Sequence, residues 1–428
     1  MDFLIFYFAS IQFLLKKYHI VFVSIFILAS SYLEVNYGDG GKSNFIFPHQ
    51  VSDTGLLLFI FFFLYSIIKH GLYTNSKLRV PVLVFWIFLL LSGFVDVLQG
   101  VAIVDVIKYL RGWLYLLIIY IDPELYVPYI EKTLRYLFVI VLILTILIIF
   151  QNVTDFSWFG TRIDEVRGIK PSFYVLLFIP LLLFDVLRLA SICKYLFIAI
   201  LVSSIILNLK QTYLFTVIFT YVLFLILYQK QKLLIFLKVI VILTAILALI
   251  LTNNSLRERI SETIAGVGSI KNEKSADNFS FRILHTKKRL NYILENPLTT
   301  LRGIGFIHED SLRTKIFAIG SWNQVQKRIE QLETGDIAWS VFFVRIGVFG
   351  TILFLFFYLS LLKRLYLMAN SLPPSENQLH KVLFSFMIVC LFLTSFGNSV
   401  IAYGYFYLIP LMTVASKNKS NLNIIEQN

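Results

Sequence analysis

Long apolar segments recur along most of the chain and constrain its fold more than any other feature. The sequence has 428 residues, of which 58% are hydrophobic and 16% aromatic, and its mean hydropathy is +0.79. A soluble domain is about half apolar. Here the apolar residues are also gathered into blocks, many of them close to the roughly 20 residues that a helix needs to cross a bilayer. We therefore predict an all-α, polytopic membrane helix bundle, because helices satisfy their own backbone hydrogen bonds in lipid.

The apolar blocks predict about twelve membrane spans. Residues 3–15 are too short for a comfortable span and are followed at once by Lys16 and Lys17, so we interpret them as an interfacial or half-inserted helix. The predicted spans lie near residues 20–34, 55–69, 80–98, 102–121, 136–150, 171–188, 195–208, 212–228, 236–252, 339–362, 381–396 and 399–415. They predict an N-terminal bundle (1–252), a long polar loop (253–338), and C-terminal helices with a tail (339–428).

The basic residues predict which side of the membrane each loop faces. The net charge is +13, which in a membrane protein is explained by the positive-inside bias and by anionic lipid rather than by nucleic acid. Most Lys and Arg of the short loops fall in one alternate set, which we place in the cytoplasm. The other short loops hold only Lys42, Arg162, Arg167, Lys170 and Lys210. Both termini are therefore expected inside, and residues 253–338 outside.

The long polar loop is expected to contain three amphipathic helices. Ser255 to Glu258 is a capping box that predicts the first helix. The second is predicted at about 281–295, because Asn296-Pro297 ends it. A third is predicted from Ser321 to Gly335, with Trp322, Val325, Ile329 and Leu332 as its apolar stripe. Such helices can lie on the outer membrane surface or on the mouth of the bundle.

One face of the second loop helix is a candidate anion site. Arg282, His285 and Arg289 are spaced i, i+3, i+7, and Arg binds phosphate or pyrophosphate through two parallel hydrogen bonds. The alternative is a solvated basic face near anionic lipid headgroups. We favour the anion site for Arg282 and Arg289.

Further cations lie on the expected outer side, which the positive-inside bias depletes. Arg162, Arg167 and Lys170 fall within nine residues, and Lys210 lies in a tight outward turn between two spans. An anionic ligand would explain them. Pairing of the first three with Asp164 and Glu165 is the alternative reading.

The end of the long loop supplies the candidate proton acceptors. The segment Arg302-Gly303-Ile304-Gly305-Phe306 precedes His308, Glu309 and Asp310, and Asp336 stands just before the next span. These carboxylates, together with His308 and His285, are the titratable groups that could act as a base. The two cysteines offer neither a disulfide framework nor a zinc site, and no His-Glu-x-x-His or comparable spacing appears. We therefore predict no metal site and no cofactor.

These motifs together resemble the O-antigen ligase/polymerase superfamily (Wzy-like). The resemblance is carried by an Arg-led helix at Arg282, by Asn296-Pro297, by Gly303-Ile304-Gly305-Phe306, by Asp336, which opens a span, and by Gly347-Val-Phe-Gly350. It covers most of the chain, since the topology of about twelve spans with one large late periplasmic loop also agrees. It implies a GT-C-like helical bundle in the bacterial inner membrane and a metal-independent membrane glycosyltransferase.

The resemblance also implies a substrate and roles for residues. The donor would be an undecaprenyl-pyrophosphate-linked glycan whose pyrophosphate is held by outward-facing cations, here Arg167, Lys210 and Arg282, with Arg289 and Arg162 as further candidates. The ligase branch has a presumed base, a histidine, where this chain has Asp336, which argues for a repeat-unit polymerase. Asp336 is then the candidate base, and His308 the weaker one. Membrane lipid and a chain-length regulator protein are the further expected partners. A ligase and a lipid-linked-glycan flippase remain as alternatives.

Overall fold

The computed structural model describes most of the predicted bundle. The described residues are 2–30, 51–154, 173–207, 211–228, 278–307, 314, 317, 319–323, 328–331, 338–393 and 400–415. They are overwhelmingly helical, which confirms an all-α polytopic membrane protein. Five helical stretches among them are long and apolar enough to cross a membrane: Asp53–His70, Arg79–Leu98, Pro123–Thr154, Trp339–Ser371 and Glu376–Leu393. Twelve spans are not confirmed.

The described N-terminal part of the bundle contains six α-helices, with three 3₁₀ segments between the fifth and the sixth. These elements are α1 (Asp2–Leu14), α2 (Tyr18–Ala29), α3 (Val51–His70), α4 (Arg79–Leu98), α5 (Ile103–Arg111), η1 (Leu114–Tyr120), η2 (Pro123–Leu125), η3 (Val127–Tyr129) and α6 (Ile130–Thr154). Helix α1 packs against α2 and α3, so the short first segment is part of the bundle.

The predicted span 102–121 is wrong as a single helix. Helix α5 ends at Arg111, and the chain continues as the 3₁₀-helix η1. The side chain of Arg111 forms an ion pair with Asp53 at the start of α3. At the break, Gly404 packs so closely on Gly112 that an added Cβ would lie 3.0 Å from the Gly112 carbonyl carbon. The Arg111–Asp53 ion pair and the Gly404–Gly112 contact, both with distant segments, thus lie at the end of α5. Local hydropathy does not predict that the helix ends there.

The remaining elements follow in a second half of the bundle. They are α7 (Phe173–Leu183), α8 (Ser191–Leu207), α9 (Gln211–Tyr228), α12 (Asn278–Leu294), α13 (Pro297–Arg302), β1 (Ser321–Asn323), β2 (Arg328–Glu330), α14 (Ala338–Ser371), α15 (Pro374–Leu393), η6 (Val400–Ala402), η7 (Gly404–Tyr407) and α16 (Leu408–Ala415). The predicted last span 399–415 is therefore two 3₁₀ segments followed by a short helix. The predicted span 236–252 and first loop helix lie outside the described residues.

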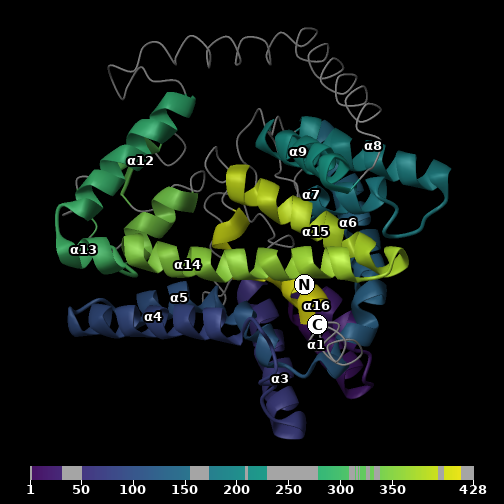
Figure 1. Ribbon diagram of the computed structural model, residues 1–428, viewed down its shortest axis with the longest axis horizontal. Coiled ribbons are helices and arrows are strands. Elements are labelled where there is room, and N and C mark those ends of the chain that lie inside the picture. Colours follow the sequence, from purple (N-terminus) through teal and green to yellow (C-terminus); the bar gives the residue numbers. More distant parts are fainter. Residues whose placement is uncertain are drawn as a thin grey trace.

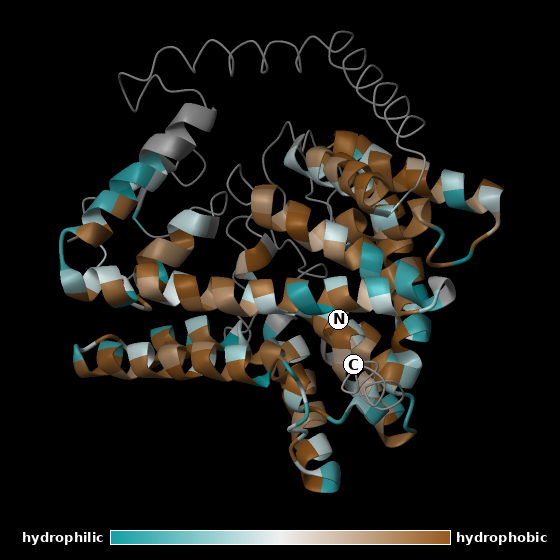
Figure 2. Ribbon diagram, in the orientation of Figure 1, coloured by the Kyte–Doolittle hydropathy of each residue, from teal (hydrophilic) through white to brown (hydrophobic). Residues whose placement is uncertain are grey.

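The faces of α4 indicate how the bundle meets lipid. Val82, Phe85 and Leu89 are completely buried, whereas Leu90 and Phe94 are more than half exposed. Figure 2 shows the same hydrophobic colouring along α4 and α14, while α12 carries hydrophilic residues. An exposed apolar face of this extent is a liability in water, and it is the surface that a hydrocarbon solvent favours.

Helix α14 is too long for one membrane span and is broken near its start. Its 34 residues would extend about 50 Å as a continuous helix, against a hydrocarbon thickness of about 30 Å. Gly347 interrupts it with φ 67° and ψ −174°, which only glycine adopts easily. The part before Gly347 turns away from the long part and lies beside α12 (Figure 1). The break therefore separates a short segment, residues 338–346 and hereafter called the outer segment, from the long remainder of α14.

The third predicted loop helix is wrong. Strands β1 and β2 pair antiparallel there, with Trp322 opposite Ile329. On a helix the same two residues would stand at i and i+7, on one face. Both geometries bring them together, so the apolar spacing could not distinguish a helix from a hairpin. The second predicted helix is confirmed as α12, three residues earlier at its start and one at its end.

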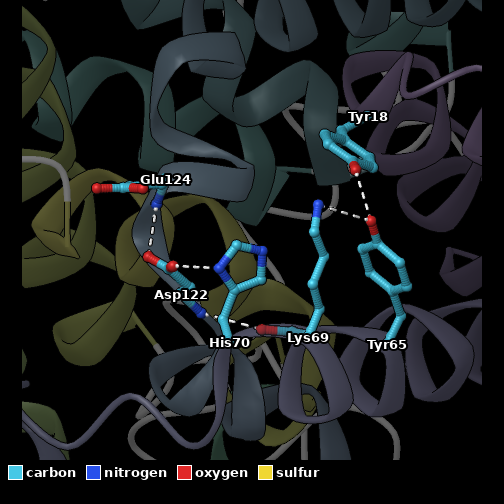
Figure 3. Close-up of polar contacts among 7 residues, drawn as sticks. Tyr18, Tyr65, Lys69, His70, Asp122 and Glu124 are labelled. Atoms are coloured by element: carbon cyan, nitrogen blue, oxygen red, sulfur yellow. Dashed lines mark hydrogen bonds and ion pairs between the residues drawn. The ribbon is translucent and has the colours of Figure 1, made fainter.

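Polar contacts connect the C-terminal end of α3 to neighbouring elements (Figure 3). His70 Nδ1 lies 3.1 Å from the Asp122 carboxylate. Lys69 donates a hydrogen bond to the Tyr65 hydroxyl, which lies 3.3 Å from the Tyr18 hydroxyl of α2. Asp122 also caps η2 by accepting from the Glu124 backbone N–H. These contacts tie α2, α3 and η2 together at the opposite end of α3 from Asp53.

Candidate functional site

Toward the C-terminal end of α12, the predicted basic stripe faces the protein interior. The Arg289 side chain is completely buried. Its guanidinium donates to Ser340 Oγ at 3.1 Å and to the Gln331 backbone carbonyl. Arg289 therefore joins α12 to the outer segment of α14 and to the end of the hairpin. A buried guanidinium is stable only when its donors are used in this way.

His285 lies one turn earlier on the same buried face. Its side chain is 3% exposed. Burial, together with the positive charges of the neighbouring Arg289 and Lys288, lowers the pKa of His285 to about 3. The imidazole is therefore neutral at physiological pH. A group with so low a pKa is a weak general base near pH 7, because catalytic bases work best with a pKa near the working pH.

The two glycine motifs meet at the break in α14. Gly303 ends α13 with φ 73°, and a Cβ there would lie 2.8 Å from the Gly347 nitrogen. Gly347 is equally restricted, since its Cβ would lie 2.8 Å from the Arg302 nitrogen. The Ile304 N–H donates to the Val344 carbonyl at 2.8 Å. The Gly-x-Gly segment, residues 303–307, hereafter the glycine loop, is thus in backbone contact with the kink.

A buried carboxylate holds the glycine loop from the other side. Asp96, near the end of α4, accepts a hydrogen bond from the Phe306 N–H at 2.8 Å and forms an ion pair with Arg302. Arg302 also donates to the Gln99 side-chain carbonyl. A Cβ at Gly305 would lie 2.6 Å from the Asp96 carboxyl carbon, so only glycine lets the carboxylate approach.

A second buried arginine and two aromatic rings complete the contacts of the glycine loop. Arg345, two residues before the kink, donates to the Ile307 carbonyl and lies 6.0 Å from the centre of the Tyr109 ring. Tyr109 of α5 stacks on Phe306 with ring centres 4.3 Å apart. Three elements, α4, α5 and α14, therefore fix the glycine loop.

The structure brings together only part of the predicted site. Arg162, Arg167, Lys210, His308 and Asp336 lie outside the described residues. Arg282 is on α12 within the described backbone, but its side chain is not described. Within the part of the chain that the structure describes, no group of three His, Cys, Asp or Glu side chains could hold a metal ion.

Asp96, Arg345 and Ser340 did not figure in the sequence prediction. The signal that could have identified the first two is a single charged residue within an otherwise apolar segment, which is a functional-site hypothesis by default. Ser340 carries no such signal, because an isolated serine in a helix is common.

The comparison with known families agrees with this geometry. Residues 196–355 match the family model of the O-antigen ligases (Wzy_C). The resemblance to the O-antigen polymerase/ligase superfamily is confirmed. The match includes α12, the glycine loop and the kink of α14. The match covers less than half of the chain, so it shows what residues 196–355 are similar to. Together with the five long apolar helical stretches, it supports a multi-pass membrane protein with an O-antigen-ligase-like region. No curated protein matches the sequence.

Proposed function

We propose that the protein is a repeat-unit polymerase, which joins undecaprenyl-pyrophosphate-linked oligosaccharides at the periplasmic face of the bacterial inner membrane. The observation that carries this proposal is the family match over residues 196–355, combined with Asp336 at the position where the ligase branch has a histidine. The product would be O-antigen, capsular polysaccharide or exopolysaccharide. Both termini would lie in the cytoplasm, and a chain-length regulator would be a protein partner.

The proposed reaction is glycosyl transfer between two lipid-linked glycans. A hydroxyl of the acceptor sugar attacks the anomeric carbon of the donor, and the bond to the pyrophosphate breaks. Asp336 accepts the hydroxyl proton, with His308 as the weaker candidate. Arg167, Lys210, Arg282 and Arg162 stabilise the negative charge that develops on the leaving pyrophosphate. No metal ion is needed in this scheme, because the guanidinium and ammonium groups supply the positive charge.

Arg289 fits this scheme best as a support for the pyrophosphate site. Its bonds to Ser340 and to the Gln331 carbonyl fix the inward face of α12. Arg282 lies two turns earlier on the same helix, so the orientation of α12 decides where the Arg282 guanidinium can reach. Arg289 would therefore act on the substrate chiefly through the placement of Arg282.

A ligase, which transfers finished polymer to an acceptor lipid, is the second candidate. The description of the matching family as O-antigen ligase favours it. A polymerase and a ligase differ in the acceptor and share the lipid-linked donor, so the same cations would serve both.

Deletion of the gene distinguishes these functions through the lipid-linked species that accumulates. Loss of a polymerase leaves single repeat units on the outer leaflet, and re-expression of the protein restores long glycan. Loss of a ligase leaves finished polymer on its carrier lipid. Loss of a flippase leaves single units on the inner leaflet. Either of the last two results would refute the polymerase.

A further inference from the structure

We propose that Asp96 is a positioning residue of the glycan-transfer site and that its carboxylate sets the position of the glycine loop. This inference rests on the proposed function. Asp96 lies on α4, outside the region that matches the family model. The contact it makes with the glycine loop spans more than 200 residues of sequence.

The first support is that the carboxylate contacts the backbone of the glycine loop. One oxygen accepts from the Phe306 N–H at 2.8 Å, and the other is engaged by Arg302. The Asp96 side chain is fully buried, so water does not compete for these bonds. A bond to the main chain fixes the path of the loop whatever side chains it carries.

The second support is that the loop is shaped to admit this carboxylate. Gly305 has φ 91°, a conformation that side chains rarely adopt, and a Cβ there would overlap the Asp96 carboxyl group. On the far side of the loop, the Gly303–Gly347 contact and the Ile304–Val344 hydrogen bond press it against the kink of α14. The loop is therefore clamped between α4 and α14, at the ends of these helices where α13 lies (Figure 1).

The third support is what the clamped loop carries. Ile307 is its last described residue, and His308, Glu309 and Asp310 follow in the sequence. The outer segment of α14, which contacts the loop on the side opposite Asp96, begins two residues after Asp336. Asp96 thus helps to fix the two described segments that adjoin these candidate proton acceptors in the sequence, and a misplacement of about 1 Å in a catalytic site can lower a rate about 100-fold.

The same contacts assign Arg302 to the clamp. Its guanidinium is shared between Asp96 and Gln99, and the side chain is 7% exposed. Of the three buried arginines described near the loop, Arg302 has a fully buried carboxylate as its partner. We therefore place Arg302 in the support of the loop and outside the set of cations that hold the donor pyrophosphate.

Two double variants separate positioning from simple stability. Asp96→Asn with Arg302→Met removes both charges but keeps an oxygen that can accept from the Phe306 N–H. Asp96→Leu with Arg302→Met has the same charge and nearly the same shape without that acceptor. Each is expressed in a deletion strain, and long glycan per unit of membrane protein is measured beside the thermal unfolding of the purified protein in detergent.

The Asn double variant is expected to keep most of the wild-type glycan. The Leu double variant should lose at least about tenfold in glycan at a similar protein level and unfolding temperature. Equal glycan per unit of accumulated protein from the two would overturn the proposal. If the Leu variant does not accumulate, Gly305→Ala tests the same contact from the loop, with the same loss expected and normal glycan overturning it. If wild-type protein itself restores no glycan, the proposed function fails instead.

Discussion

Arg289 and Ser340, 51 residues apart in the sequence, are joined by a hydrogen bond of 3.1 Å between two completely buried side chains. This bond couples the basic helix α12 to the outer segment of the broken helix α14. Arg289, which the sequence predicts as part of an anion-binding stripe, therefore connects α12 to the segment of α14 that leads to the kink at Gly347.

Replacing Arg289 is expected to weaken both stability and glycan synthesis. In Arg289→Lys, a single ammonium cannot reach Ser340 and the Gln331 carbonyl together, because it lacks the planar fork of the guanidinium. Loss of one such charged bond costs about 1.5–3 kcal/mol in the free energy of unfolding. Thermal unfolding and glycan ladders measure the two effects. Lys287→Ala, an exposed position on the same helix, is the matched control and should behave as wild type.

His285 is expected to make the protein less stable in acid. The unfolded chain binds a proton on this histidine near pH 6.5, whereas burial keeps the folded pKa at about 3. Protonation therefore favours the unfolded state, and stability is lost as pH falls below about 6, by up to about 1.4 kcal/mol per pH unit.

His285→Leu tests this dependence, because it removes the titrating group and keeps the site apolar. Its unfolding temperature should fall less than that of wild type between pH 7 and pH 5. Parallel pH dependences in the two proteins would contradict the buried, neutral imidazole.

Gly303→Ala is expected to disrupt the meeting of the glycine loop with the kink. The methyl group would overlap the backbone at Val344 and Gly347, besides the backbone strain at φ 73°. Gly71→Ala is the matched control, since Gly71 has φ 76° but nothing within 4 Å of an added Cβ. The control should lose only about 1–2 kcal/mol of stability and keep glycan synthesis. Gly303→Ala should lose more stability and most of the glycan. Similar effects of the two changes would refute the close contact.

Much of the fold follows from apolar segment length, but the contacts that hold the site do not. The span predicted at 80–98 is α4, Arg79–Leu98, because a long apolar run specifies a helix locally and its one proline, Pro81, stands in the first turn, where a helix tolerates proline. The apolar spacing at Ser321–Glu330 predicts a helix where the chain forms a hairpin, since both structures place Trp322 near Ile329. The bond between Asp96 and Phe306 depends on tertiary packing between residues 210 positions apart, which no local pattern encodes.

Substitution of the proposed pyrophosphate ligands is expected to lower glycan synthesis without lowering stability, unlike substitution of Arg289 or Gly303. Arg282→Ala or Arg167→Ala should abolish long-chain glycan in cells while the protein level stays normal, because these residues are assigned to substrate charge rather than to packing. Glycan ladders and immunoblots of membranes measure both. Unchanged ladders in both mutants would refute these assignments.

The most direct test of the account is reconstitution of the purified protein in liposomes with lipid-linked repeat units and a metal chelator. If the protein is a metal-independent polymerase, the wild type forms a ladder of carrier-linked products of two, three and more units, and Arg282→Ala forms none. Units that remain single, or that polymerise only when a divalent metal is added, would contradict it.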